Sequence, residues 1–159
     1  MICLDEKKII TANVETTPSN HESYQNYEYF KHLIVPKEAA NQCTVAIMEI
    51  PPQKSSYPYH FHMGITEVFY IINGIGRLET PDGERAVTKG DVIVFPPGKQ
   101  GAHRIMNISE SEMLVYLDCD TTSISDFTFY PHSGKMGTIV AGESAFFELK
   151  DKVDYYKGE

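Results

Sequence analysis

Short runs of β-branched and aromatic residues, separated by turn-forming residues, cover the middle of the chain. Proline and glycine punctuate these runs, as at Pro51-Pro52, Asn73-Gly74 and Pro81-Asp82-Gly83. Proline cannot donate to a strand ladder and glycine tolerates a positive φ, so these positions predict strand ends and hairpin turns. The close spacing, without a helical period, is typical of an all-β barrel or sandwich. The predicted strands are 43–50, 57–62, 67–72, 75–80, 84–88, 92–95, 102–108 and 112–117.

The pattern is less regular at both ends of the chain. Residues 13–30 are polar and rich in tyrosine and predict a loop or a short helix, whereas 31–35 predicts a strand that stops at Pro36. The tail is too short to bury a core of its own, so its aromatic residues are expected to pack onto the barrel in irregular segments. We therefore expect one domain, 1–159, with a core barrel at about 43–118, an N-terminal extension 1–42 and a C-terminal tail 119–159.

Composition excludes several classes of protein. The formal net charge of −8 argues against binding nucleic acid or an anionic membrane through a broad basic patch. No apolar run approaches the roughly 20 residues that span a bilayer, and charges interrupt the first ten residues, where a signal peptide has its apolar core. We expect a cytoplasmic protein without nucleic-acid or membrane partners. Its widely spaced cysteines form no CxxC and predict reduced thiols, at Cys3, Cys43 and Cys119.

Histidines provide the candidate chemistry. His60 and His62 are two residues apart on an extended segment, so their side chains point to the same face. Glu67 would face the opposite side in an unbroken strand, but a bend within residues 63–66 can return it to the histidines. His103 begins a later predicted strand. Three imidazoles and a carboxylate suit one divalent first-row transition metal (Mn, Fe, Ni, Co, Cu or Zn) rather than calcium.

These residues resemble the two motifs of the cupin superfamily. Residues 58–74 are similar to the first motif, PxHxHxxxxExxxxxxG, and residues 90–107 to the second, with Pro96, Gly98 and Asn107 at its other characteristic positions. One departure is that four residues separate Gly98 from the histidine, where the motif has two. The tail also resembles uncharacterised single-domain bacterial cupins. The resemblance implies a double-stranded β-helix, or jelly-roll barrel, in which the metal ligands are His60, His62, Glu67 and His103.

The resemblance leaves the function open among several alternatives. The first is an enzyme acting on a small acid, sugar or phenol as a dioxygenase, decarboxylase or isomerase, with substrate oxygens or dioxygen at open metal positions. The second is a non-catalytic module that binds a carbohydrate or acid for sensing or storage, and the third is a purely structural cupin. An open barrel mouth with an acid or arginine near the metal favours the enzyme, and a plugged lumen favours the third.

Strand parity predicts what else faces the barrel interior and what faces out. If the metal ligands point inward, Phe69, Ile71, Ile105 and Asn107 do too, while Val68, Tyr70 and Ile72 point outward. A strand that is apolar on both faces is expected to be covered on both, either by the chain's own termini or by a second copy in a homodimer, which the resemblance favours. Candidate substrate contacts are Glu49, Arg77, Arg104 and Tyr116, and the histidines expected at the surface are His21, His32 and His132.

Overall fold

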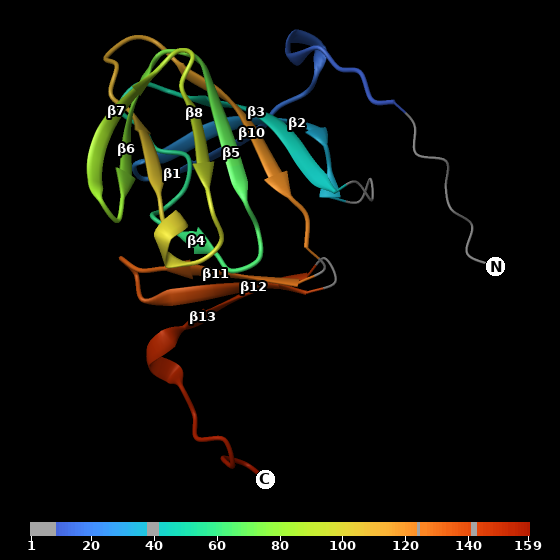
Figure 1. Ribbon diagram of the computed structural model, residues 1–159, viewed down its shortest axis with the longest axis vertical. Coiled ribbons are helices and arrows are strands. Elements are labelled where there is room, and N and C mark those ends of the chain that lie inside the picture. Colours follow the sequence, from blue (N-terminus) through green and yellow to red (C-terminus); the bar gives the residue numbers. More distant parts are fainter. Residues whose placement is uncertain (1–8, 38–41, 124, 141–142) are drawn as a thin grey trace, which may run out of the picture.

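A computed structural model describes residues 9–37, 42–123, 125–140 and 143–159. The described part of the chain forms antiparallel sheets that wrap into a barrel, with the two ends of the chain leaving it in different directions (Figure 1). The largest sheet has the order β1-β2-β3-β10-β5-β8, with strands β1 (Asn20–Tyr24), β2 (Tyr27–Val35), β3 (Cys43–Ile50), β10 (Leu114–Thr121), β5 (Glu67–Asn73) and β8 (Val92–Phe95).

Two smaller sheets complete the fold. The order β7-β6-β9 joins β7 (Gly83–Thr88), β6 (Ile75–Thr80) and β9 (Arg104–Asn107). The order β13-β12-β11-β4 joins β13 (Glu143–Glu148), β12 (Lys135–Val140), β11 (Ser125–Tyr130) and β4 (Phe61–His62). Three short 3-10 helices lie among the described residues: η1 (Val14–Thr16), η3 (Lys99–Gly101) and η4 (Leu149–Asp151). This architecture confirms the predicted all-β jelly-roll barrel.

Both ends of the chain are more regular than the sequence predicted. The β1–β2 hairpin extends the large sheet and includes residues 20–30, for which the sequence predicted a loop or a short helix. The predicted strand 31–35 is confirmed as the second part of β2. The tail forms three paired strands, β11 to β13, and not irregular segments. Asp126 and Thr128 are buried on the inner side of β11. Because these inward positions are polar, the tail lacks the apolar alternation by which a half-buried strand is predicted.

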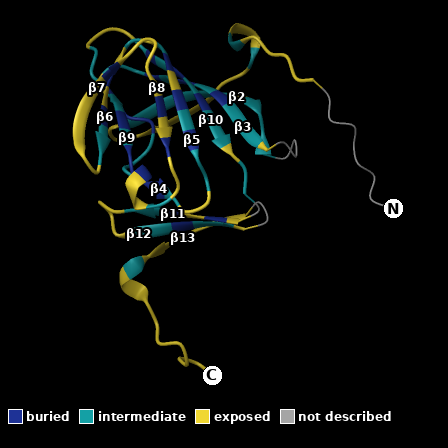
Figure 2. Ribbon diagram, viewed as in Figure 1, coloured by how far each residue is buried: buried dark blue, intermediate teal, exposed yellow. Residues whose placement is uncertain are grey.

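The apolar core fills the interior of the barrel, where Phe69 and Phe95 pack against the His103 ring. Figure 2 shows the buried residues on the strands of the barrel. Strand parity is confirmed on β5, where Phe69 and Ile71 are buried and Tyr70 is 42% exposed. On β9, Ile105 and Asn107 are buried as predicted. The core consists of Ala46, Met48, Ile50, Phe69, Ile71, Leu78, Val87, Ile93, Phe95, Ile105, Leu114 and Tyr116.

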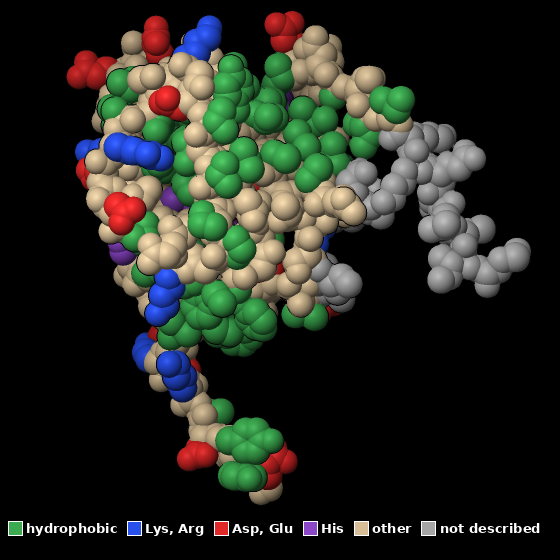
Figure 3. Space-filling view, in the orientation of Figure 1, with side chains coloured by type: hydrophobic (Ala, Val, Ile, Leu, Met, Phe, Trp, Pro, Cys, Tyr) green, Lys and Arg blue, Asp and Glu red, His purple; other side chains and the backbone are tan. Residues whose placement is uncertain are grey.

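The outer face of β5 and β8 stays apolar and accessible. Val68 pairs with Val94 and Tyr70 with Val92 across these strands, and the described residues leave Val92 63% and Val94 58% exposed. Figure 3 shows hydrophobic side chains gathered over this side of the barrel. One of the two expectations was that the chain's own termini cover this face. The described parts of the termini do not cover it.

The cysteines agree with the prediction of reduced thiols where they are described. Cys43 begins β3 and Cys119 lies on β10, and both are free thiols. Burial raises the pKa of the Cys119 thiol, which favours its neutral form. Cys3 lies outside the described residues. No helix in the described ranges has the length and hydropathy that a bilayer span requires.

Candidate metal centre

The backbone brings the two sequence motifs together at His60 and His103. These residues form an isolated antiparallel bridge, in which the His60 N–H donates to the His103 carbonyl at 3.1 Å and the His103 N–H donates back at 2.9 Å. Pro58 has no N–H to donate, and β4 is confined to Phe61 and His62 instead of the predicted 57–62. The bridge holds together two candidate ligands that are 43 positions apart in the numbering.

Glu67 reaches the same space because the chain breaks between β4 and β5. The Thr66 N–H donates to Thr121 Oγ1 at 2.9 Å, which anchors the start of β5 to β10. Glu67 is then the first residue of β5 and is only 7% exposed. The predicted bend within residues 63–66 is therefore present, and it returns the carboxylate to the side of the histidines.

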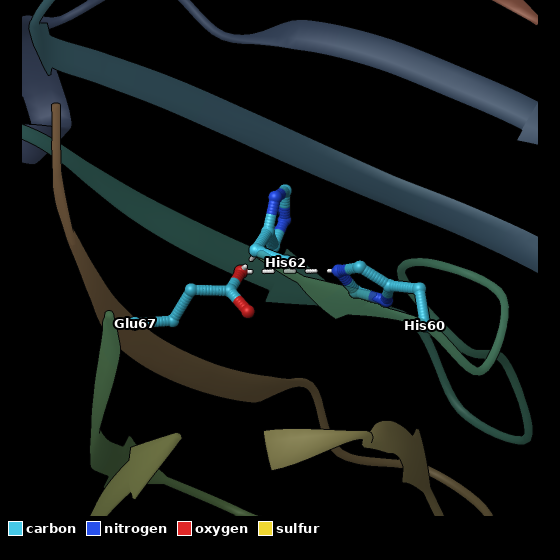
Figure 4. Close-up of side chains that lie close together, drawn as sticks. All are labelled: His60, His62 and Glu67. Atoms are coloured by element: carbon cyan, nitrogen blue, oxygen red, sulfur yellow. Dashed lines mark ion pairs between the residues drawn. The ribbon is translucent and has the colours of Figure 1, made fainter. Parts of the chain in front are cut away.

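Four predicted side chains meet around the Glu67 carboxylate (Figure 4 shows three of them). Glu67 Oε1 lies 3.8 Å from His60 Nε2 and 3.7 Å from His62 Nε2. Glu67 Oε2 lies 3.5 Å from His103 Nε2. The ligand atoms of His60, His62 and Glu67 all lie within 4.8 Å of one another. The structure thus assembles all four side chains, while their binding of a metal stays a prediction.

The Nδ1 atom of each imidazole contacts a carbonyl or carboxylate oxygen, while Nε2 faces Glu67. His60 Nδ1 lies 2.8 Å from the Pro58 carbonyl and His103 Nδ1 lies 2.9 Å from the Gly101 carbonyl. His62 Nδ1 contacts the Asp126 carboxylate, which also accepts the Gly64 N–H at 2.8 Å. A carbonyl or carboxylate can only accept, so each Nδ1 carries the proton and each neutral ring keeps its lone pair on Nε2.

This arrangement of donors fits a metal cation. Lone pairs on three Nε2 atoms turn toward one carboxylate, and His103 Nε2 is buried without a hydrogen-bond partner. Lone pairs and a carboxylate repel one another unless a proton or a cation lies among them. Ligating histidines characteristically donate their second N–H to a carbonyl or carboxylate, as these three do. The described residues can therefore hold a cation at this point.

The pKa values of the cluster follow from burial and from mutual charge. Burial alone would raise the pKa of Glu67, but the attraction between its anionic form and the neighbouring imidazoles of His60, His103 and His62 lowers it to about 2. Burial lowers the pKa of His103 to about 4, against the attraction of Glu67. Burial acts in the same direction on His60, but the attraction of the Glu67 anion, whose Oε1 lies 3.8 Å from His60 Nε2, raises its pKa overall. An anionic carboxylate beside a neutral His103 is the state that a metal needs.

The low pKa of His103 predicts acid sensitivity of the metal-free protein. In the unfolded chain this histidine titrates near 6.5, and in the folded chain near 4. As the pH falls from about 6.5 to about 4, the unfolded state binds the proton first, so the free energy of unfolding decreases across that window. Above about 6.5 this group contributes no pH dependence.

Urea unfolding of chelator-treated protein between about pH 7 and about pH 4.5 measures this effect. The raised pKa of His60 increases the free energy of unfolding on acidification, in the wild type and in His103→Gln alike. The difference between these two proteins therefore isolates the contribution of His103. We expect the variant to lose a smaller part of its stability on acidification than the wild type does. Equal losses in the two proteins would contradict the prediction.

A pocket of about 280 Å³ opens beside the cluster. Its lining residues come from β2, residues 57–62, β5, β10, β11 and β12, and most of them carry a charged or polar group. The barrel mouth is therefore not plugged. Burial raises the pKa of Tyr57 and Tyr130, whose hydroxyls therefore stay protonated near neutral pH. The lining residues are Lys31, Tyr57, His60, His62, Glu67, Asp118, Asp120, Thr128, Tyr130 and Ile139.

Several of these lining residues were not predicted from the sequence. Asp118 and Asp120 share the parity of Tyr116 on β10, so extending that parity along the predicted strand would have placed them inside. Asp126, which holds His62, carried no comparable signal, because the tail was expected to be irregular. Lys31 depends on the pairing of β2 with β3, which the sequence did not predict.

The other predicted candidates lie elsewhere. Glu49 points away from the core and faces His32 Nε2 at 3.5 Å. Arg77 pairs with Glu84 and Arg104 with Glu79, outside the pocket. Tyr116 is fully buried, and its hydroxyl donates to Ser56 Oγ at 3.1 Å.

The remaining histidines are only partly as predicted. His21 and His132 are exposed, as expected of surface residues. His32 is not a surface residue, because its side chain is only 13% exposed and its Nδ1 lies 2.8 Å from the Thr17 carbonyl. The N-terminal segment packs over it, a contact that strand parity does not predict.

Comparison with known proteins supports the same assignment. The family model of the cupin domain matches residues 46–119. None of the curated protein sequences compared with the chain matches it. A sugar phosphate isomerase of the cupin superfamily from Silicibacter pomeroyi is 18% identical, with a TM-score of 0.77 over 92% of this chain and 97% of its own.

Two further solved structures share the fold. A protein from Acidithiobacillus ferrooxidans, described as a candidate sugar phosphate isomerase, is 21% identical, with a TM-score of 0.78 over 95% of this chain and 98% of its own. A predicted oxalate decarboxylase from Thermotoga maritima is 21% identical, with a TM-score of 0.61 over 73% of this chain and 100% of its own. Residues 46–119 thus match the cupin domain, and the chain has the fold of these cupin-superfamily structures.

Proposed function

We propose that the protein is a metal-dependent enzyme that acts on a small organic molecule in the pocket beside His60, His62, Glu67 and His103. The observation that supports this most is the pocket itself, which joins a cluster fit for a metal to open space lined by acids and a cation. A structural cupin has no need of such a space. The names of the similar solved structures, two of them sugar phosphate isomerases and one an oxalate decarboxylase, agree with a sugar or an acid as substrate.

The four side chains would hold one divalent first-row transition metal, which supplies Lewis-acid polarisation of a substrate oxygen when bound. Asp126 and the carbonyls of Pro58 and Gly101 keep the three rings oriented, so little reorganisation is needed on binding. Both imidazole and carboxylate ligands are compatible with Mn, Fe, Ni, Co, Cu or Zn.

Other residues of the pocket would bind and orient the substrate. The Lys31 ammonium can attract an anionic group, and the protonated hydroxyls of Tyr57 and Tyr130 can donate hydrogen bonds to substrate oxygens. Asp118 and Asp120 supply the titratable groups that proton transfer requires within the pocket. This polar lining favours an acid or a sugar over a phenol, and it leaves dioxygenase, decarboxylase and isomerase chemistry as the reaction classes.

A substrate screen tests the proposal. The purified protein is reconstituted separately with each of the six metals and incubated with hydroxy acids, sugars, sugar phosphates and phenols. Proton NMR follows conversion, and an oxygen electrode follows dioxygen consumption. We expect metal-dependent turnover of an acid or a sugar that is absent from the His60→Ala/His62→Ala variant. Metal-loaded protein that binds such compounds without converting any of them would instead support the non-catalytic alternative.

We also propose that a second copy of the chain covers the outer face of β5 and β8, as a homodimer. Tyr70, Val92 and Val94 form an exposed apolar surface on paired strands, and exposed patches of this kind mark interaction sites. Sedimentation velocity should give a dimer for the wild type and a monomer for Val92→Lys/Val94→Lys. A monomeric wild type, or a dimer that both lysines leave intact, would contradict the proposal.

A further inference from the structure

Beside the candidate metal ligands, the pocket has a second group of charged side chains. Asp118 and Asp120 lie two residues apart on β10 and line the pocket from the same face. Asp118 is only 4% exposed. The Oδ1 atoms of both carboxyl groups are buried and have no hydrogen-bond partner among the described residues. Buried polar atoms are ordinarily satisfied, so two adjacent acceptors without donors indicate that a ligand supplies the donors.

The remaining contacts of the pair leave these acceptors free for a ligand. Thr44 Oγ1 donates to Asp120 Oδ2 at 3.5 Å, which orients that carboxyl group through its other oxygen. On the adjacent strand β5, Asp118 is paired with Phe69 and Asp120 with Glu67. Neither neighbour offers an N–H or O–H side-chain donor to the pair. Two acceptors on the same face of one strand can accept from two hydroxyl groups of a single ligand, each of which has one O–H to donate.

Lys31 adds a positive charge to the same pocket. Its ammonium lies 3.5 Å from the Tyr57 hydroxyl and 5.9 Å from the centre of the Tyr57 ring. Within the described ranges it forms no ion pair with a carboxylate. Its charge interacts with Asp118 and Asp120, but neither carboxylate is in ion-pair contact with it. The ammonium therefore keeps donors for an anionic group of a ligand, such as a carboxylate or a phosphate.

Size and charge then select one class of ligand. At roughly 30 Å³ for each water-sized group, a pocket of about 280 Å³ holds a compound of a few carbon atoms with its substituents. A simple phenol has a single O–H and would leave one of the two carboxyl oxygens without a donor. A diamine would satisfy them but would place a second cation near Lys31.

We propose that Asp118, Asp120 and Lys31 make the pocket selective for a small polyhydroxylated anion. Adjacent hydroxyl groups donate to Asp118 and Asp120, and the carboxylate or phosphate contacts Lys31. The proposal rests on the proposed function for its pocket, but it concerns which compound is bound and not which reaction follows.

Calorimetric titration of the metal-reconstituted protein with four matched probes tests this selectivity. Erythronate carries hydroxyl groups and a carboxylate, butyrate only the carboxylate, erythritol only hydroxyl groups, and 1,4-diaminobutane two amines. We expect erythronate to bind at least tenfold more tightly than each of the others. Equal or weaker binding of erythronate, or its failure to bind, overturns the proposal whether or not the protein turns over another compound.

Variants assign the selectivity to the three residues. Asp118→Asn, which keeps the shape of the side chain, and Lys31→Met should each weaken erythronate binding at least tenfold while metal content stays unchanged. Exposed residues outside the pocket provide matched controls, Asp82→Asn and Lys89→Met, which should bind as the wild type does. Thermal unfolding checks that each variant is folded. Folded Asp118→Asn and Lys31→Met proteins that bind erythronate as well as the wild type would refute the assignment.

Metal-free protein distinguishes failure of the proposed metal-dependent function from failure of the proposed ligand selectivity. If a folded wild type holds no metal, the proposed function fails, and titration of that metal-free protein still compares the four probes. The preference for erythronate over butyrate and erythritol is expected to persist there, because Asp118, Asp120 and Lys31 are not among the candidate metal ligands. Its absence would overturn the selectivity independently of the metal.

Discussion

Replacing His60 and His62 together by alanine is expected to abolish metal binding. These rings supply two of the four donors around Glu67, and both Nε2 atoms lie within 3.8 Å of its carboxylate. Losing only the partner of a metal ligand costs about 10- to 100-fold in affinity, so losing two ligands should cost at least about 1,000-fold. Elemental analysis of protein purified without chelator and titration with each metal measure the change.

A matched double variant removes the same number of imidazoles from elsewhere. His21 and His132 are exposed and lie outside the pocket, so His21→Ala/His132→Ala should retain the full metal content. Circular dichroism establishes that both double variants are folded. If the wild type holds no more metal than His60→Ala/His62→Ala, the metal centre is disproved.

Gly101→Ala is expected to destabilise the protein strongly and to disturb His103. A Cβ atom added at Gly101 would lie 1.8 Å from the Pro96 carbonyl oxygen, so the backbone of the loop has to move. Overpacking of a well-packed site costs about 1–3 kcal/mol, and a clash with backbone belongs at the upper end, near 3 kcal/mol. The Gly101 carbonyl also accepts the His103 Nδ1–H at 2.9 Å, so the shift should weaken metal binding as well.

Urea unfolding and metal titration measure both parts of this prediction. Gln100→Ala serves as the control, since Gln100 is the exposed neighbour within the same short helix η3. We expect that variant to unfold within about 0.5 kcal/mol of the wild type, as surface substitutions generally do. A Gly101→Ala protein as stable as Gln100→Ala would show that the loop tolerates the added atom.

The two extra residues of the second motif have a local explanation in η3. Lys99–Gly101 form one 3-10 turn, and the Ala102 N–H donates to the Lys99 carbonyl to close it. This turn takes up the added length before the chain reaches His103, whose bridge to His60 is intact. The departure from the motif therefore leaves His103 among the other three candidate ligands.

Local patterns in the sequence were sufficient to predict the barrel fold and the cluster of candidate metal ligands. Strand parity placed Phe69 and Ile71 inside, because alternation is a property of each strand alone. The spacing of His60, His62 and Glu67 likewise required only one strand, one bend and the next strand. The position of His103 came from its resemblance to the second motif.

Only the tertiary structure decided what surrounds the cluster. Lys31, Asp120 and Asp126 lie on β2, β10 and β11, and they come together through pairings between distant strands. The pattern of polar and apolar residues along a sequence predicts that a charged residue faces solvent. In this barrel, however, charged residues also line the inner face of the mouth. The amino-acid sequence by itself therefore determined the fold class and the candidate metal ligands. The strand pairings alone determined the pocket, because residues far apart in sequence define its shape and charge.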